Sequence, residues 1–339
     1  MNHRTLGDVG AVSEVGYGAW EIGSDWGDVS ESEAVDAVEA AREAGIDFFD
    51  TADVYGDGRS EQILGDVLDD EIATGDVTVA TKAGRRLDPH VAERYTEANL
   101  RRFVNRSREN LGTETLDLVQ LHCPPTDAYY QPETFDALDT LAAEGKIANY
   151  GVSVERVEEG LKAIEYPGVE SVQIIFNPFR QRPAELFLDE AAARDVGVIC
   201  RVPLASGLLT GALSRDTEFA EDDHRNYNRE GDAFDVGETF AGVPYEVGLD
   251  AADALAERVD AVADDPTDAT GDDLSLPQLS LRWILDHDAV STVIPGSTTP
   301  DHIRANAAAS DLAPLGEDER EVVSDVYDEF VRDHVHQRW

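Results

Sequence analysis

Four side chains of the types that proton transfer requires stand beside short apolar runs in the first part of the chain. Asp50, Lys82 and His122 each follow such a run directly, and Tyr55 lies in the loop that follows Asp50. A tyrosine with a pKa of about 10 is a poor acid–base catalyst at neutral pH unless a neighbour lowers that pKa. A nearby ammonium group lowers it, and a buried carboxylate holds the ammonium in place. A neutral histidine can orient a carbonyl group. This set predicts acid–base chemistry at a carbonyl.

The electrons for such a reaction must come from elsewhere. The chain shows no activated serine or cysteine nucleophile and no metal-ligand spacing, so we expect no metal, and Cys123 and Cys200 are interpreted as structural. Hydride from a nicotinamide cofactor fits. Structural explanations stay open for single residues: Asp50 as a turn cap, Tyr55 as half-buried packing and His122 as a satisfied histidine. Lys82 is harder to explain in that way, because it is one of three lysines in an arginine-rich chain.

The elements that must position these residues alternate along the chain. Strand-like runs are expected at residues 15–17, 46–49, 77–81, 116–121, 147–151, 171–176, 198–202 and 290–294, with helical periodicity between and after them. This predicts an α/β fold, a parallel (β/α)8 TIM barrel, with an N-terminal β-hairpin at residues 6–15 and extra C-terminal helices at residues 317–335. In a barrel the carboxyl ends of the strands meet at one face, which gathers the four side chains.

Two further features concern organisation. A doubly wound open sheet is the competing fold, but no G-x-G-x-x-G follows an early strand. No linker or internal repeat divides the chain, so we expect a single domain over residues 1–339.

The charge balance is strongly acidic. Lys and Arg number 27 against 71 Asp and Glu, a net charge of −44. Such a chain repels phosphate backbones and anionic membranes, so neither nucleic acid nor a membrane is an expected partner. An acid-rich, lysine-poor composition spread over helices is typical of a protein that works in concentrated salt, where repulsion is screened. No apolar leader and no run of 18 apolar residues is present, which predicts a cytoplasmic location.

Several motifs are jointly specific. In order and spacing, DTADVYGDGRSE, ATKAG, DLVQLHCP, GKIANYGVS, VQIIFNPF, PLASGLLTG and IPGSTTPDHIRAN resemble the aldo-keto reductase family over about residues 5–309. With the acidic composition, the chain looks like a halophilic archaeal-type member. The resemblance implies a (β/α)8 barrel and NADPH-linked carbonyl reduction without metal. It also implies a catalytic tetrad of Asp50, Tyr55, Lys82 and His122, with Tyr55 as general acid.

The resemblance also implies where the cofactor binds. Ser153 and Gln173 would hold the nicotinamide carboxamide, and the remaining contacts would come from Gly18, Ala19, Trp20, Arg201, Pro203, Leu204, Ser206, Gly207, Leu209, Gly296, Ser297, Thr298, His302 and Asn306. Val154 replaces an asparagine that usually follows the serine, and Asn177 is a candidate substitute. Arg201 replaces a stacking aromatic residue, and it either stacks on the nicotinamide or faces a carboxylate of a nearby loop. NADP(H) is favoured and NAD(H) is the alternative, because residues 297–299 carry no basic side chain.

The substrate is expected to be a small carbonyl compound or a sugar, bound by Trp20, Trp26, Tyr55 and His122 and by residues 124–131. The segment 222–230 contributes Arg225, Tyr227 and Arg229, which either cover the barrel mouth or belong to a surface loop held by salt bridges. Three other functions stay open: an NAD(P)+-dependent sugar or alcohol dehydrogenase, a cofactor-binding regulatory protein with little turnover, and a metal-free barrel hydrolase or isomerase.

Overall fold

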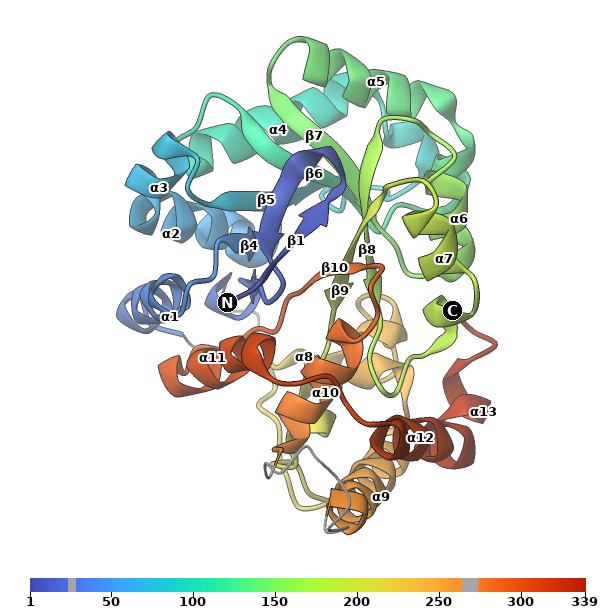
Figure 1. Cartoon of the computed structure of the whole chain (residues 1–339). Helices are drawn as coiled ribbons and strands as arrows, with labels where there is room; N and C mark the ends of the chain where they lie inside the picture. Colours follow the sequence, from blue (N-terminus) through green and yellow to red (C-terminus); the bar gives the residue numbers. More distant parts are fainter. Residues whose placement is uncertain (24–28, 264–273) are drawn as a thin grey trace.

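Eight parallel strands form a barrel in the computed structural model, which describes residues 1–23, 29–263 and 274–339 (Figure 1). Neighbouring strands follow one another in chain order, as expected for repeated strand–helix units. Their bounds are β3 (Tyr17–Gly18), β4 (Phe48–Asp50), β5 (Thr78–Ala83), β6 (Leu116–His122), β7 (Ile147–Ser153), β8 (Val169–Ile175), β9 (Gly197–Arg201) and β10 (Val290–Val293).

The barrel closes where the chain that leads into β3, its first strand, meets β10, its last strand. Val15 forms a parallel bridge with Val293, and the N–H of Gly16 donates to the carbonyl of Val293 at 2.8 Å. A Cβ added at Gly18 would lie 2.8 Å from the Ile294 carbonyl oxygen, so the glycine allows the two segments to approach. The predicted barrel is therefore confirmed.

Helices surround the barrel (Figure 1). Their bounds are α1 (Glu31–Glu43), α2 (Arg59–Val67), α3 (Asp69–Thr74), α4 (Glu97–Leu111), α5 (Pro132–Ala143), α6 (Val157–Ala163), α7 (Phe187–Ala192), α8 (His224–Tyr227), α9 (Tyr245–Ala263), α10 (Leu276–Leu285), α11 (Pro300–Ala307), α12 (Glu317–Val326) and α13 (Arg332–Val335). Ser30 begins α1 with a capping box that it forms with Glu33. None of the helices in these described ranges is long and apolar enough to cross a membrane.

Two helical regions are irregular in the structure. Before β9, a 3-10 turn (Arg182–Glu185) precedes the short α7. The C-terminal helices expected at residues 317–335 are α12 and α13, which are joined by a π-helical turn (Tyr327–Val331).

The interior of the barrel changes from apolar to polar along its axis. The predicted hairpin, β1 (His3–Leu6) and β2 (Gly10–Ser13), supplies Leu6 and Val12 to a buried cluster that contains Phe48, Ala80, Leu118 and Ile199 from four barrel strands. Side chains two positions apart on a strand share a face. The next inward-facing residues on these four strands are Asp50, Lys82, Gln120 and Arg201, all buried. An apolar plug therefore supports a layer of polar side chains.

Candidate active site

Lys82 lies at the centre of the polar layer. Its ammonium nitrogen is 2.5 Å from Oδ2 of Asp50, 2.9 Å from the carbonyl oxygen of Thr51 and 3.3 Å from the phenol oxygen of Tyr55. Lys82 and Asp50 come from β5 and β4, which pair in parallel and bring their carboxyl ends together. The structure thus places three of the four predicted catalytic residues in one hydrogen-bonded chain.

Two amides hold the carboxylate of Asp50 from the far side of the barrel. Oδ1 of Asp50 accepts from Nε2 of Gln173 at 2.6 Å and from Nε2 of Gln120 at 3.3 Å. Sequence reasoning missed Gln120, although its position two residues before His122 on β6 gives it the same inward face. Gln173 was expected to hold a carboxamide, and in the structure its amide N–H₂ is used by Asp50.

The pKa of Tyr55 differs in direction from the sequence-based expectation. Burial raises the pKa of the phenol, and the nearby Lys82 ammonium opposes that rise without cancelling it. For Lys82, burial alone would lower the pKa, but Asp50 and Tyr55 together outweigh burial and the pKa is raised. The phenol therefore keeps its proton at neutral pH next to a charged ammonium, which suits a proton donor.

His122 completes the tetrad and is neutral. Burial lowers its pKa well below the usual range, and the positive charges of Arg85 and Lys82 lower it further. Its ring stands edge-on to Tyr55, with ring centroids 6.0 Å apart. Its Nδ1 is buried and makes no hydrogen bond to the described residues. A neutral imidazole beside the phenol can take part in a hydrogen bond to a carbonyl oxygen.

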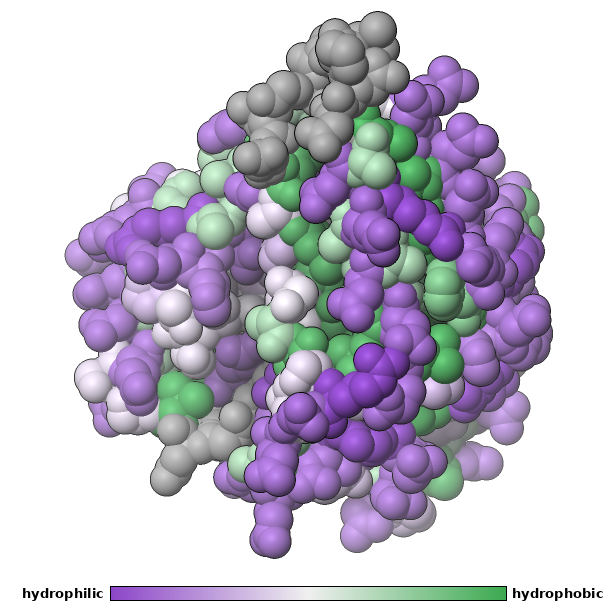
Figure 2. All heavy atoms as spheres, turned by 90° about the horizontal axis from the view of Figure 1, so that it is seen from below, coloured by the Kyte–Doolittle hydropathy of each residue, from purple (hydrophilic) through white to green (hydrophobic). Residues whose placement is uncertain are grey.

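A cleft of about 620 Å³ opens above these residues. Most of the predicted site residues line it, namely Gly18, Trp20, Asp50, Tyr55, His122, Ser153, Gln173, Arg201, Pro203, Leu204, Ser206, Gly207, Gly296, Ser297, Thr298, His302 and Asn306. The molecule seen from below is hollowed, with apolar residues beside the hollow and hydrophilic residues around the periphery (Figure 2). Ala19 and Leu209 do not line the cleft, because both are fully buried, and the predicted substrate residue Trp26 lies outside the described residues.

Comparison with known proteins identifies this arrangement. The model of the Aldo/keto reductase family matches residues 14–328. The chain belongs to the aldo/keto reductase family.

Individual relatives agree with the family match. The chain is 29% identical to an uncharacterized oxidoreductase of Bacillus subtilis, covering 94% of each chain. It is 27% identical to the NADH-specific methylglyoxal reductase of Escherichia coli, over 89% of this chain and 90% of the other. Among solved structures, an aldo-keto reductase of Bacillus halodurans in its holo form has a TM-score of 0.75 at 26% identity and 99% coverage of both chains. The glycerol dehydrogenase of Gluconobacter oxydans has a TM-score of 0.74 at 26% identity, covering 98% and 96%.

As a member of this family, the protein is an NAD(P)H-dependent oxidoreductase that reduces a carbonyl group. The resemblance stated from its motifs is therefore confirmed at the level of the family and the reaction. The alternative of a barrel hydrolase or isomerase has no support from these relatives.

The loop after β9, where the sequence predicts cofactor contacts, has an unusual backbone. Val202, Ala205, Ser206 and Gly207 all have positive φ, at 52°, 48°, 53° and 99°. A valine in this region is a strained conformation, and such strain collects at ligand sites. Ser206 and Gly207 line the cleft, while the N–H groups of Ala205 and Gly207 donate to the carbonyls of Val202 and Leu204 at 3.0 and 2.9 Å and hold the loop in this conformation.

Glu21 is a residue of the cleft that sequence reasoning missed, and it lies near Thr298. Burial raises the pKa of Glu21 to about 7, and Arg225 opposes the rise. Arg225 also lines the cleft, near Gly207, and belongs to the segment 222–230 that the sequence singled out. No motif marked Glu21, because it lies in a short 3-10 turn (Glu21–Gly23) whose path depends on the rest of the fold.

Two expectations about the nicotinamide end are corrected by the structure. Val154 is fully buried in the hydrophobic core, and the amide of Asn177 is used by the backbone of Val202 and Phe179, so Asn177 does not replace the missing asparagine. Arg201 faces a loop carboxylate, with Nη1 3.8 Å from Oε2 of Glu238. The second of the two alternatives for Arg201 therefore describes its contact in this structure.

The segment 222–230 is held mainly by its own contacts. Arg225 binds Asp223 at 2.6 Å and lies over Phe219, and Arg229 lies 5.0 Å from the ring centroid of Tyr245. The part of this segment that reaches the catalytic residues is His224, whose ring centroid is 4.8 Å from that of Trp20. Trp20 in turn stacks on Tyr55, with ring centroids 5.9 Å apart.

Proposed function

We propose that Tyr55 is the proton donor in the reduction of a small aldehyde or ketone by this protein. The observation that carries the proposal is the position of the Lys82 ammonium, which contacts both the Asp50 carboxylate and the Tyr55 phenol at the floor of the cleft. A bound nicotinamide would supply hydride to the carbonyl carbon. The Tyr55 O–H would donate its proton to the carbonyl oxygen, and Lys82 would stabilise the phenolate that remains.

His122 would orient the substrate. Because it is uncharged, its ring can share a hydrogen bond to the carbonyl oxygen without competing with Tyr55 for the proton. Trp20 stacks on Tyr55 and gives the site an apolar wall that excludes water.

The chain has donors for the rest of a nicotinamide dinucleotide. The guanidinium of Arg225 suits a diphosphate, and Ser206 and Gly207 line the cleft beside it. Residues 296–298 precede α11, whose N-terminal end favours an anion. Arg304 on α11 is paired with Glu43 and Asp301, which leaves His302 as the basic residue of α11 that lines the cleft. We favour NADP(H), with NAD(H) as the alternative.

Fluorescence titration with NADPH and with NADH in molar salt tests the cofactor assignment. We expect saturable binding at micromolar concentrations, and the tighter ligand identifies the preferred cofactor. A panel of aldehydes and ketones then tests turnover. No binding of either nucleotide would contradict the proposal.

A second direction of the same reaction has its own support. The structural neighbour from Gluconobacter oxydans is a glycerol dehydrogenase, so oxidation of a polyol or sugar is a candidate physiological direction. Assays with NADP+ or NAD+ and glycerol or an aldose distinguish the two directions.

A regulatory role with little turnover is less favoured, because Asp50, Tyr55, Lys82 and His122 are all in place.

Two properties of the whole chain belong to the same proposal. The net charge of −44 supports function in concentrated salt, as in a halophilic organism. The continuous barrel and its helices support a single domain over residues 1–339. Unfolding curves measured at increasing KCl concentrations test both properties. We expect a single transition, because the chain is one domain, and a midpoint that rises with the KCl concentration, because the acidic surface is adapted to salt.

A further inference from the structure

A buried carboxylate from the long segment between β9 and α9 enters the catalytic cleft. Glu238 lies in a 3-10 turn (Val236–Glu238) and lines the same cleft as Tyr55 and His122. Its Oε1 is 2.7 Å from Nη2 of Arg85, and its Oε2 is 3.8 Å from Nη1 of Arg201. Nothing in the proposed proton transfer requires this carboxylate.

Charge around Glu238 is nearly balanced. Burial alone would raise its pKa, but Arg85 and Arg201 outweigh burial and lower the pKa to about 2, so Glu238 is ionised. Glu155 is the second carboxylate of the cluster, 3.5 Å from Arg85, and burial raises its pKa to about 7. The positive charges of Arg85 and Arg201 therefore lie near the full negative charge of Glu238 and the partial negative charge of Glu155.

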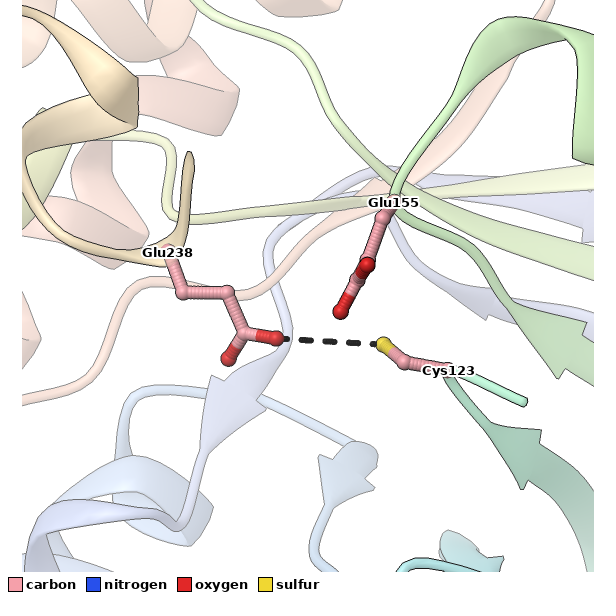
Figure 3. A group of neighbouring side chains, drawn as sticks. All are labelled: Cys123, Glu155 and Glu238. Atoms are coloured by element: carbon pink, nitrogen blue, oxygen red, sulfur yellow. Dashed lines mark hydrogen bonds between the residues drawn. The ribbon is translucent and has the colours of Figure 1, made fainter. Parts of the chain in front are cut away.

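The same cluster contains a thiol, and the three side chains converge (Figure 3). Ligand atoms of Cys123, Glu155 and Glu238 lie within 4.8 Å of one another, which is compatible with a metal site. However, the two arginines already supply the positive charge that a cation would bring. Burial also raises the pKa of Cys123 to about 12, which keeps the thiol protonated. We therefore interpret the group as an ion-pair cluster.

The backbone on both sides of Glu238 is fixed. The Ser206 hydroxyl donates to the Glu238 carbonyl at 3.3 Å and accepts from the N–H of Phe240 at 3.1 Å. Nε1 of Trp339 donates to Asp235 at 2.9 Å, three residues before Glu238. Because the loop is tied at both points, the carboxylate is held in the cleft as a permanent part of its wall.

We propose that Glu238 occupies the anion site that Arg85 and Arg201 would otherwise offer in the cleft that Tyr55 lines, and thereby excludes carbonyl substrates that carry a carboxylate. This inference rests on the proposed function. A substrate carboxylate in the cleft would have to compete with the fixed Glu238 carboxylate for the two guanidinium groups, so it would gain no ion pair in return for its desolvation. A neutral substrate meets no such barrier. Glu238 thus acts as a specificity-determining residue.

The test compares two aldehydes of the same shape, 4-nitrobenzaldehyde and 4-carboxybenzaldehyde. The measured quantity is the ratio of their kcat/KM values in wild type and in Glu238→Gln, because intrinsic reactivity cancels between the two proteins. We expect the variant to shift the ratio toward the carboxylate by about tenfold or more. An unchanged ratio in a variant that folds and binds NADPH would overturn the proposal.

Two further variants test whether the change in the ratio comes from Glu238 itself. Glu230→Gln removes an exposed glutamate of the same segment, so it controls for net charge and should leave the ratio unchanged. Arg85→Gln removes a guanidinium while Glu238 stays, and it should shift the ratio further against the carboxylate. A shift toward the carboxylate in Arg85→Gln would also overturn the proposal, and this result is available even if Glu238→Gln does not fold.

Failure of the proposed function would look different. If wild type reduces neither aldehyde, nor any other carbonyl, the reductase account fails. If wild type reduces 4-nitrobenzaldehyde but Glu238→Gln keeps the wild-type ratio, only the role of Glu238 fails.

Discussion

Nε2 of Gln173 lies 2.6 Å from Oδ1 of Asp50, which ties β8 to β4 across the centre of the barrel. The other oxygen of the same carboxylate holds Lys82. The proton transfer proposed for Tyr55 therefore depends on an amide carried by β8, which is four strands away from β4 in the sheet.

Removal of this amide tests the dependence. Gln173→Leu leaves Oδ1 of Asp50 with the longer bond to Gln120, and we expect a loss of about 1 to 3 kcal/mol of unfolding free energy. We also expect kcat to fall about tenfold as Lys82 shifts. Chemical denaturation and steady-state kinetics measure the two effects. Gln62→Leu, at an exposed position, is the matched control, and an equal effect there would refute the assignment.

Lys82→Met tests the buried ion pair. The substitution leaves the Asp50 carboxylate buried without its cation, which should cost about 3 to 5 kcal/mol of unfolding free energy. Turnover should fall at least about a hundredfold, because nothing stabilises the Tyr55 phenolate. Lys162→Met removes a partly exposed lysine paired with the exposed Glu165 and should change neither quantity measurably. Retention of full turnover by Lys82→Met would contradict the account.

Asp53 predicts a pH dependence of stability. Both of its carboxyl oxygens are buried without a hydrogen-bond partner among the described residues, and burial next to Glu61 raises its pKa from 3.8 to about 7. A folded state with the higher pKa binds the proton more tightly, so this group's contribution falls as pH rises from about 4 to 7. Relative to Asp53→Asn, wild type should lose about 3 kcal/mol of unfolding free energy between pH 5 and pH 8.

The control for this prediction is Asp57, whose pKa shifts in the opposite direction. The exposed Asp57 binds Arg86 and Arg106, and these hydrogen bonds lower its pKa, so its contribution is already complete above pH 5. Asp57→Asn should therefore show no difference from wild type in pH dependence between pH 5 and pH 8. Denaturation in molar salt at both pH values measures each variant. A parallel pH dependence of wild type and Asp53→Asn would show that Asp53 does not titrate in this range.

Trp339 connects the final residues of the chain to the segment that carries Glu238. Its ring is buried, lies 3.9 Å from the guanidinium carbon of Arg180 and packs on Gly237 and Gly242. Trp339→Ala should lower the unfolding free energy by about 3 kcal/mol. Because the segment loosens, the variant should also discriminate less between neutral and anionic aldehydes. Gln337→Ala, at an exposed position, is the neighbouring control, and indistinguishable stabilities of the two variants would contradict the packing role.

Periodicity and local order predicted much of this molecule. The barrel followed from eight alternations, since each strand–helix unit is short and its hydrophobic pattern is local. Asp50, Lys82 and His122 could be placed together because they end parallel strands. Gln120 could have been found by the same two-residue spacing that places Lys82 above Ala80.

The remaining features depend on contacts that no local pattern encodes. Glu238 and Glu21 lie in short 3-10 turns, and the position of Glu238 is set by distant partners such as Arg85, Ser206 and Trp339. The direction in which the pKa of Tyr55 shifts could not be predicted from the sequence either. Burial raises this pKa and the Lys82 charge lowers it, and only the full environment decides which effect is larger.

Tyr55→Phe tests the central claim most directly. The variant lacks the phenol oxygen that lies 3.3 Å from Lys82 and keeps the ring that stacks on Trp20. The measurement is single-turnover oxidation of bound NADPH by 4-nitrobenzaldehyde, with the NADPH dissociation constant determined on the same sample. We predict a rate lower by at least about a hundredfold and a dissociation constant within about threefold of wild type. A variant that oxidised NADPH at the wild-type rate would show that Tyr55 is not the proton donor.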